Sequence, residues 1–144
     1  MSTPETASPS AAPAGIGLRA AIWGAQVLVF VALVLSGVMK LTWPIPQLAE
    51  VAPWTGDVPA AFVRFIACIE LAGAAGILLP SLTRIRPGLT IVAAYAVGLL
   101  MLFAIVFHTI RGDGMTGYAT PMVLLWLSGL VAWGRWRRAP IRSR

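Results

Sequence analysis

One glutamate, Glu70, stands in the middle of a long apolar run of this chain. It lies about 11 residues into the run, or roughly 16 Å at 1.5 Å per residue. The hydrocarbon core of a bilayer is about 30 Å thick, so this depth is near its centre. A charge there costs roughly 2.5–3.5 kcal/mol, so Glu70 is predicted to face other helices and to be paired or protonated. It is either a site residue that can carry a proton or one half of a structural ion pair.

Three other ionisable residues lie in or at the ends of apolar runs. Lys40 ends the first run and is either a snorkelling lysine or a partner of Glu70 or of a ligand. Arg64 precedes Glu70 by six residues, which places the two about 120° apart around a helix, so Arg64 is an interfacial anchor or a binding residue. His108 is the single histidine, and it either exchanges protons or sits at the interface.

These residues are predicted to lie in one half of the membrane. With Lys40, Arg64 and His108 above Glu70, they form a polar intramembrane cluster that would receive an anionic or polar head group. We predict this cluster as a binding site and assign no catalytic residue. A lone histidine without spaced partners gives no metal site. Cys68 is the only cysteine, so it forms no internal disulfide, and we expect a small packing residue.

The composition predicts the elements that position this cluster. Of the 144 residues, 58% are hydrophobic and 11% are charged, against about 25% charged residues in a soluble domain. Four apolar runs are long enough to cross a bilayer as helices, at about residues 20–40, 59–79, 88–110 and 117–136. The sequence therefore predicts an all-α membrane protein, a four-transmembrane-helix bundle. A proline-rich loop over residues 41–57 joins the first two spans, the second span stops at Pro80, and Pro121 falls in the first turn of the fourth.

The flanking segments predict the domain organisation and the orientation. Residues 1–18 are rich in Pro, Ser and Ala and are expected to form a disordered tail, residues 19–136 the transmembrane domain, and residues 137–144 a basic cytoplasmic tail. The net charge of +6 comes from arginines between and beyond the apolar runs, which favours a membrane-topology signal over nucleic-acid binding. Eight arginines lie on the side of the two termini against two or three basic residues on the other side. Both termini are therefore predicted to be cytoplasmic.

Several stretches of the chain resemble the DoxX-like family of bacterial four-span membrane proteins. They are residues 36–41 (SGVMKL), 65–80 (FIACIELAGAAGILLP) and 101–108 (MLFAIVFH), in this order and spacing. The resemblance implies a four-helix fold in the bacterial inner membrane. Relatives include the small subunit of a thiosulfate:quinone oxidoreductase and mycobacterial proteins that assemble with thiol-oxidative-stress proteins. Lys40, Glu70 and His108 match recurrent polar positions of the family.

Two classes of function follow from these observations. The first is a non-catalytic membrane subunit or organiser of a redox complex, with quinone as the one cofactor that the resemblance suggests. The second is a small transporter or an autonomous membrane enzyme with a polar site around Glu70. The chain has no cysteine pair, no pair of haem ligands and no nucleotide motif, which argues against redox catalysis of its own. Its expected partners are membrane lipids and either further copies of itself or a membrane redox complex.

Overall fold

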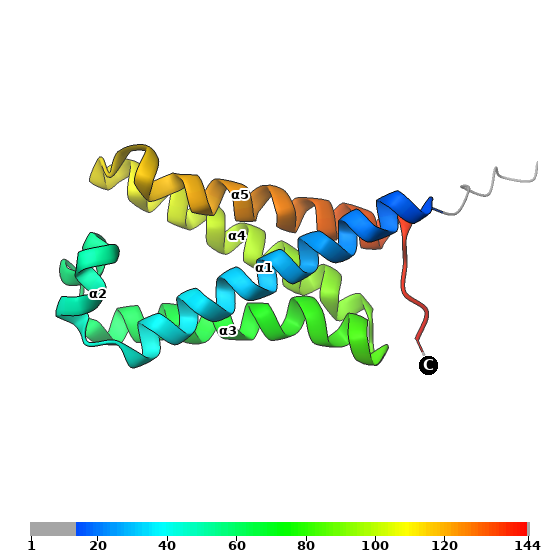
Figure 1. The fold of residues 1–144 in the computed structure, drawn as a ribbon, viewed down its shortest axis with the longest axis horizontal. Helices are drawn as coiled ribbons and strands as arrows, with labels where there is room; N and C mark the ends of the chain where they lie inside the picture. The colour runs from blue at the N-terminus through cyan, green and yellow to red at the C-terminus, as the bar shows by residue number, and fades with distance from the viewer. Residues whose placement is uncertain (1–13, 144) are drawn as a thin grey trace, which may run out of the picture.

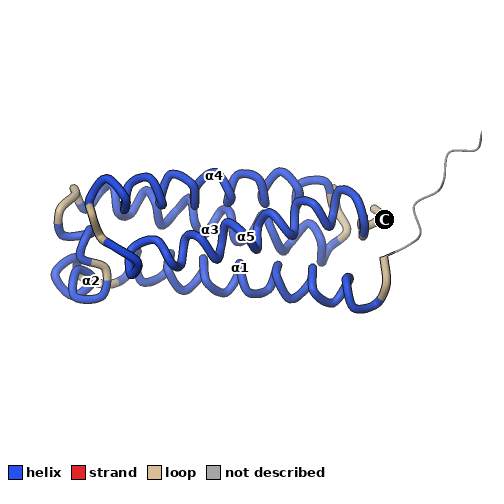
Figure 2. Tube along the Cα trace, turned by 90° about the horizontal axis from the view of Figure 1, so that it is seen from above, coloured by secondary structure: helices blue, strands red, loops and turns tan. Residues whose placement is uncertain are grey.

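Four long apolar helices run side by side along the molecule (Figure 1). The computed structural model describes residues 14–143. Within them, the four helices long and apolar enough to cross a membrane are α1 (Ile16–Thr42), α3 (Ala60–Thr83), α4 (Gly88–Arg111) and α5 (Gly114–Trp133), the last continued by a π-helical turn, Gly134–Arg138. The described part of the chain has no strand (Figure 2). The predicted all-α four-helix membrane bundle is confirmed.

The helices close into a ring, in which α1 packs on α3 and α5, and α4 packs on the same two helices. Small and branched side chains fill the centre, among them Val29, Ile77 and Val97, each at most 1% exposed. Large apolar side chains such as Phe65, Phe103 and Trp126 point outwards. This inverted pattern is that of a bundle in contact with lipid, in which close packing of small residues joins the helices.

Glycine allows two of these contacts. A Cβ atom on Gly37 of α1 would lie 2.8 Å from Leu71 Cγ, and one on Gly76 of α3 would lie 2.9 Å from the Cβ atom of Ala93. Both separations are too short for a larger side chain. Gly37 therefore lets α1 approach α3 one turn before Lys40, and Gly76 lets α3 approach α4.

The connection between the first two spans is not an open loop. It contains the short helix α2 (Ile45–Val51) and a 3-10 turn, Pro53–Gly56. The prolines that predict a loop here stand at or next to the first position of each helical turn, where a missing N–H costs nothing. Together they cover one end of the bundle, which we call the α2 end; it also carries Asp57 and the Arg111–Gly114 turn (Figure 1).

Two helices run past the prolines that were expected near their ends. α3 continues through Pro80 to Thr83 and ends at Arg84, whose φ of 59° is left-handed. α5 begins at Gly114, so Pro121 lies inside it and not in its first turn. A proline removes only one backbone hydrogen bond, and membrane helices accommodate this loss.

The ends of the described chain also differ from expectation. α1 begins at Ile16, so the last residues of the predicted 1–18 tail are helical; residues 1–13 lie outside the described part. At the other end, Arg137 and Arg138 belong to the π-helical turn, which the Ala139 N–H closes on the Gly134 carbonyl at 2.7 Å. This end of the bundle carries Arg19, the α3–α4 turn and the C-terminal segment. We call it the basic end.

Candidate functional site

Lys40 and Glu70 form an ion pair between α1 and α3. Lys40 Nζ lies 2.7 and 2.9 Å from the two carboxylate oxygens of Glu70. Lys40 also donates to Ser36 Oγ, which in turn donates to Glu70 Oε1 at 3.2 Å. The side chains of Lys40 and Glu70 are only 11% and 8% exposed. Glu70 thus faces the inside of the bundle with Lys40, a partner that the sequence suggests, beside it.

The packing of α1 on α3 explains this pairing. Ser36 and Lys40 are four residues apart and share a face of α1. Gly37, between them, approaches the backbone of α3 at Ala67, since its Cβ atom would lie 3.2 Å from the Ala67 carbonyl oxygen. This close contact puts the flexible lysine within reach of Glu70. The lysine therefore does not extend away from the bundle, as a snorkelling side chain would.

Arg64 has a different role from the other three predicted cluster residues. Its guanidinium group donates to the carbonyl of Lys40 and, at 2.8 Å, to that of Trp43. The last carbonyls of a helix have no partner within the helix, and a basic side chain can satisfy them. Arg64 therefore caps the C-terminal end of α1 and fixes the backbone that carries Lys40.

His108 is held by a carboxylate across the α4–α5 turn. Its Nδ1 lies 2.6 Å from Asp113 Oδ2, which also accepts from Arg111 Nε at 3.0 Å. The hydrogen bond from His108, together with Arg111, lowers the pKa of Asp113 below its ordinary value against the opposing effect of desolvation. Arg111 continues the chain of charges to Asp57 at 2.8 Å. Because Asp113 takes Nδ1, Nε2 is the ring nitrogen left for another partner.

Trp54 brings the two polar groups into one site. Its ring centroid is 5.8 Å from Lys40 Nζ and 6.4 Å from the His108 ring, which it meets edge to face. Phe107 completes an aromatic group with Trp54 and His108. The 3-10 turn over the α2 end thus places an indole beside both the ion pair and the histidine.

A cavity of about 740 Å³ lies at this place. α1, α3, α4, α5 and the α2 connection all contribute to its wall, which is mainly apolar. Its polar residues are Ser36, Lys40, Glu70, His108, Asp113, Thr116 and Thr120. Ligand sites are typically apolar cavities of 300–1,000 Å³ with a few convergent polar groups. Three of the four predicted cluster residues line this cavity, and Arg64 stands behind it.

Sequence reasoning missed several residues of the site. Asp113 follows His108 by five residues, and its position beside a glycine in a polar turn was the available signal that the chain could fold it back. Gly117 must be small, since a Cβ atom there would lie 2.7 Å from that of Asp113 and 3.0 Å from His108 Nδ1.

Cys68, expected to be a packing residue, is exposed on the outer face of α3. Among residues 14–143 no group of His, Cys, Asp and Glu could hold a metal ion.

A comparison with known families identifies the chain. The profile of the DoxX-like family matches residues 24–131, which include all of α3 and α4, most of α1 and α5, and every residue of the cavity wall. The chain belongs to the DoxX-like family. No curated protein and no solved structure matches it.

Proposed function

We propose that this DoxX-like membrane protein is a non-catalytic subunit of a redox complex, and that its α2-end cavity holds the head group of a quinone. The observation that carries the proposal is the polar pair Lys40–Glu70 on the wall of a mainly apolar cavity of about 740 Å³. A membrane-soluble ligand with a flat ring and opposed oxygens has matching chemistry. We further propose the bacterial inner membrane as the location, with both termini in the cytoplasm.

The donors around the cavity fit a quinone. Lys40 has three N–H groups, and all three donate hydrogen bonds, one to Ser36 and two to Glu70. A ligand oxygen would therefore take the place of Ser36 Oγ. His108 offers Nε2 to a second oxygen: a charged ring would donate to a quinone carbonyl, and a neutral ring would accept from the hydroxyl of the reduced quinol. Trp54 offers an aromatic surface between them. A bound quinone would supply the two-electron acceptor that this chain's own residues do not.

Quenching of Trp54 fluorescence tests the binding of a quinone. A short-chain ubiquinone analogue is titrated into the protein in detergent, with Trp54→Phe and Trp126→Phe as matched variants. Trp126 is 79% exposed and does not line the cavity. We expect saturable quenching in the wild type and in Trp126→Phe, and its loss in Trp54→Phe. Quenching that is linear and equal in all three proteins would mean that the analogue only partitions into the micelle.

Two further variants separate the roles of the polar groups. Lys40→Met removes a charged hydrogen bond worth about 1.5–3 kcal/mol, so the analogue should bind roughly 10- to 100-fold more weakly. Ser36→Ala keeps the ion pair and frees one N–H of Lys40, so binding should be kept or tightened. If Ser36→Ala weakened binding as much as Lys40→Met, the ligand oxygen would not replace the serine hydroxyl.

Membership of a redox complex is tested separately. The tagged protein is purified in mild detergent, and the proteins and lipids that accompany it are identified by mass spectrometry. We expect an oxidoreductase in the purified complex, together with quinone. If the protein purified without an oxidoreductase while the analogue still quenched its fluorescence saturably, this result would support the quinone site and refute membership of a redox complex.

A further inference from the structure

The basic end of the bundle collects positive charge without carboxylates. Within residues 14–143 the acidic residues are Glu50, Asp57, Glu70 and Asp113, and all lie in the half of the bundle toward the α2 end. The arginines of the basic end are Arg19, Arg84, Arg86, Arg135, Arg137, Arg138 and Arg142. No ion pair joins any of these arginines to a described carboxylate. An anion from outside the described chain is therefore the natural counter-charge for this end.

Arg135 folds the C-terminal segment back over the basic end. It is only 5% exposed, donates from Nε to Gln26 Oε1 at 2.7 Å, and stacks on Trp23 at 4.6 Å. Its NH1 group also donates to the Ala139 carbonyl at 3.3 Å. Gln26 is held in turn by the Ile77 carbonyl at 2.7 Å. This buried network fixes the point at which the chain leaves α5 and turns toward the α3–α4 connection (Figure 1).

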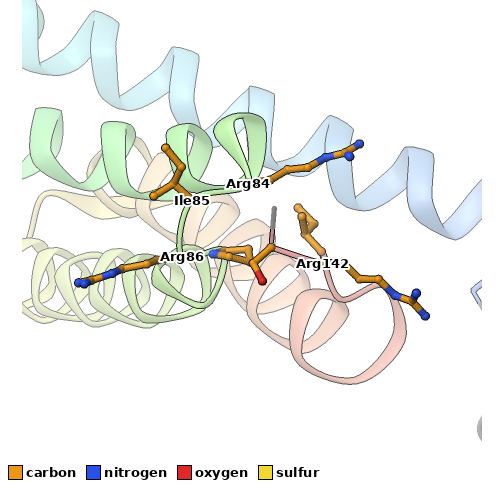
Figure 3. Close-up of a pocket in the computed structure, with 7 residues that line it drawn as sticks. Arg84, Ile85, Arg86 and Arg142 are labelled. Atoms are coloured by element: carbon orange, nitrogen blue, oxygen red, sulfur yellow. The ribbon is translucent and has the colours of Figure 1, made fainter.

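The turned segment and the α3–α4 turn border an open surface hollow of about 710 Å³. Arg84 and Arg86 line it from the α3–α4 turn and Arg142 lines it from the C-terminal segment (Figure 3). Ile85 and Ile141 add apolar surface to the lining. Arg84 and Arg86 both have positive φ angles, 59° and 47°. The angle of Arg84 ends α3, as left-handed residues often end helices. The angle of Arg86 is unfavourable for a residue other than glycine, and strained residues of this kind cluster at ligand sites and switch regions.

We propose that this hollow binds the phosphate of an anionic phospholipid head group. Guanidinium groups bind phosphate oxygens through paired, charge-assisted hydrogen bonds. In Figure 3 the guanidinium groups of Arg84, Arg86 and Arg142 spread away from one another, as three like charges should. A phosphate between them replaces this repulsion by attraction, and the long arginine side chains have the freedom to turn toward it.

The position of the hollow favours a lipid over free phosphate as the source. Ile85 and Ile141 give it an apolar wall, and Ile85 is 67% exposed. At the same end Trp133 and Trp136 stack with Arg138 and Arg137, an arrangement typical of the membrane–water interface. A head group at this level places its phosphate beside the arginines and its acyl chains beside the helices.

Lipid titration of the full chain tests the site. The protein in a zwitterionic detergent receives phosphatidylglycerol, phosphatidylcholine or inorganic phosphate, and binding is read by native mass spectrometry and by the melting temperature. Arg84→Gln/Arg142→Gln is compared with Arg137→Gln/Arg138→Gln, which removes the same charge outside the hollow. We expect phosphatidylglycerol to bind and raise the melting temperature, with affinity lost at least about tenfold in the first variant and within about threefold in the second.

The other outcomes have definite meanings. If both double variants lost the same affinity for phosphatidylglycerol, binding would depend only on the total charge of the basic end. This result would overturn the site. Equal binding of phosphatidylcholine would remove the need for an anion. If millimolar inorganic phosphate stabilised the protein as strongly as phosphatidylglycerol, the arginines would still form a phosphate site. A lipid would then be refuted as the source of the phosphate. Because the first double variant leaves Arg135 and Gln26 intact, its melting temperature without lipid should stay at the wild-type value.

Discussion

Removing one partner of the Lys40–Glu70 pair should destabilise the bundle strongly. Both side chains are about nine-tenths buried, so Glu70→Gln leaves an ammonium group with neutral partners only. Lys40→Met leaves a carboxylate with Ser36 as its one donor within the described residues. Breaking a buried ion pair from one side typically costs about 3–5 kcal/mol in the free energy of unfolding. We expect each single variant to lose this much.

The double variant distinguishes an ion pair from two independent effects. Lys40→Met/Glu70→Gln removes both charges, and the remaining cost is that of a glutamine held by Ser36, about 1–3 kcal/mol. The single losses add up to roughly 6–10 kcal/mol. The coupling free energy between the two positions should therefore be at least about 3 kcal/mol.

Equilibrium unfolding in mixed micelles, followed by circular dichroism, measures these free energies. Glu50→Gln is the control, because Glu50 is exposed on α2 and lies outside the pair; its effect should stay within about 0.5 kcal/mol. Single variants within about 1 kcal/mol of the wild type would refute the buried pair. A double variant whose loss equals the sum of the two single losses would refute the coupling.

Three further predictions concern other parts of the chain. Reporter fusions at the C-terminus should be active in the cytoplasm, because the arginines gather at the basic end; an externally active fusion would reverse the orientation. Cys68→Ala should leave the melting temperature and any redox-dependent phenotype unchanged, since the chain has no second thiol for exchange, and a phenotype lost in this variant would contradict it. The pKa of Asp113 is lowered by His108 and then by Arg111, so its stabilising effect is complete above the ordinary aspartate value of about 4 and is lost as the pH falls below it. Acid titration of Trp54 fluorescence should therefore show a step below about pH 4 that Asp113→Asn lacks, and the same step in that variant would assign it to another group.

Hydropathy predicts the helices because each span must satisfy its own backbone in lipid. Four runs of about 20 apolar residues leave little choice of fold. The ends of the helices are harder to predict, because proline signals both a break and a start. At Pro44 and Pro46 it begins a helix, and at Pro80 and Pro121 it lies within one. Contacts with neighbouring helices decide between these outcomes, and the sequence around each proline does not reveal those contacts.

The depth of a charged residue can be predicted from the sequence, but its direction around the helix cannot. Glu70 had to find a partner because its depth excludes water. That the partner is Lys40 and not Arg64 depends on how α1 is rotated against α3, which Gly37 decides through its contact with Leu71. The buried contact between Gln26 and Arg135 joins residues 109 positions apart. No spacing within one helix predicts such a contact.

Stability alone does not explain an ion pair on the wall of this cavity. Replacing a buried ion pair by apolar residues of similar volume is often neutral or stabilising. A methionine and a leucine at positions 40 and 70 would thus hold α1 on α3 about as well. They would not provide an N–H donor beside Trp54, nor a carboxylate that holds this donor in place within an apolar wall. The pair therefore serves to bind a ligand in the cavity more than to join the two helices. A variant with the apolar pair should melt at or above the wild-type temperature and yet fail to bind the quinone analogue. If it bound the analogue normally, Lys40 and Glu70 would be structural and the polar contacts of the ligand would fall to His108 and the threonines alone.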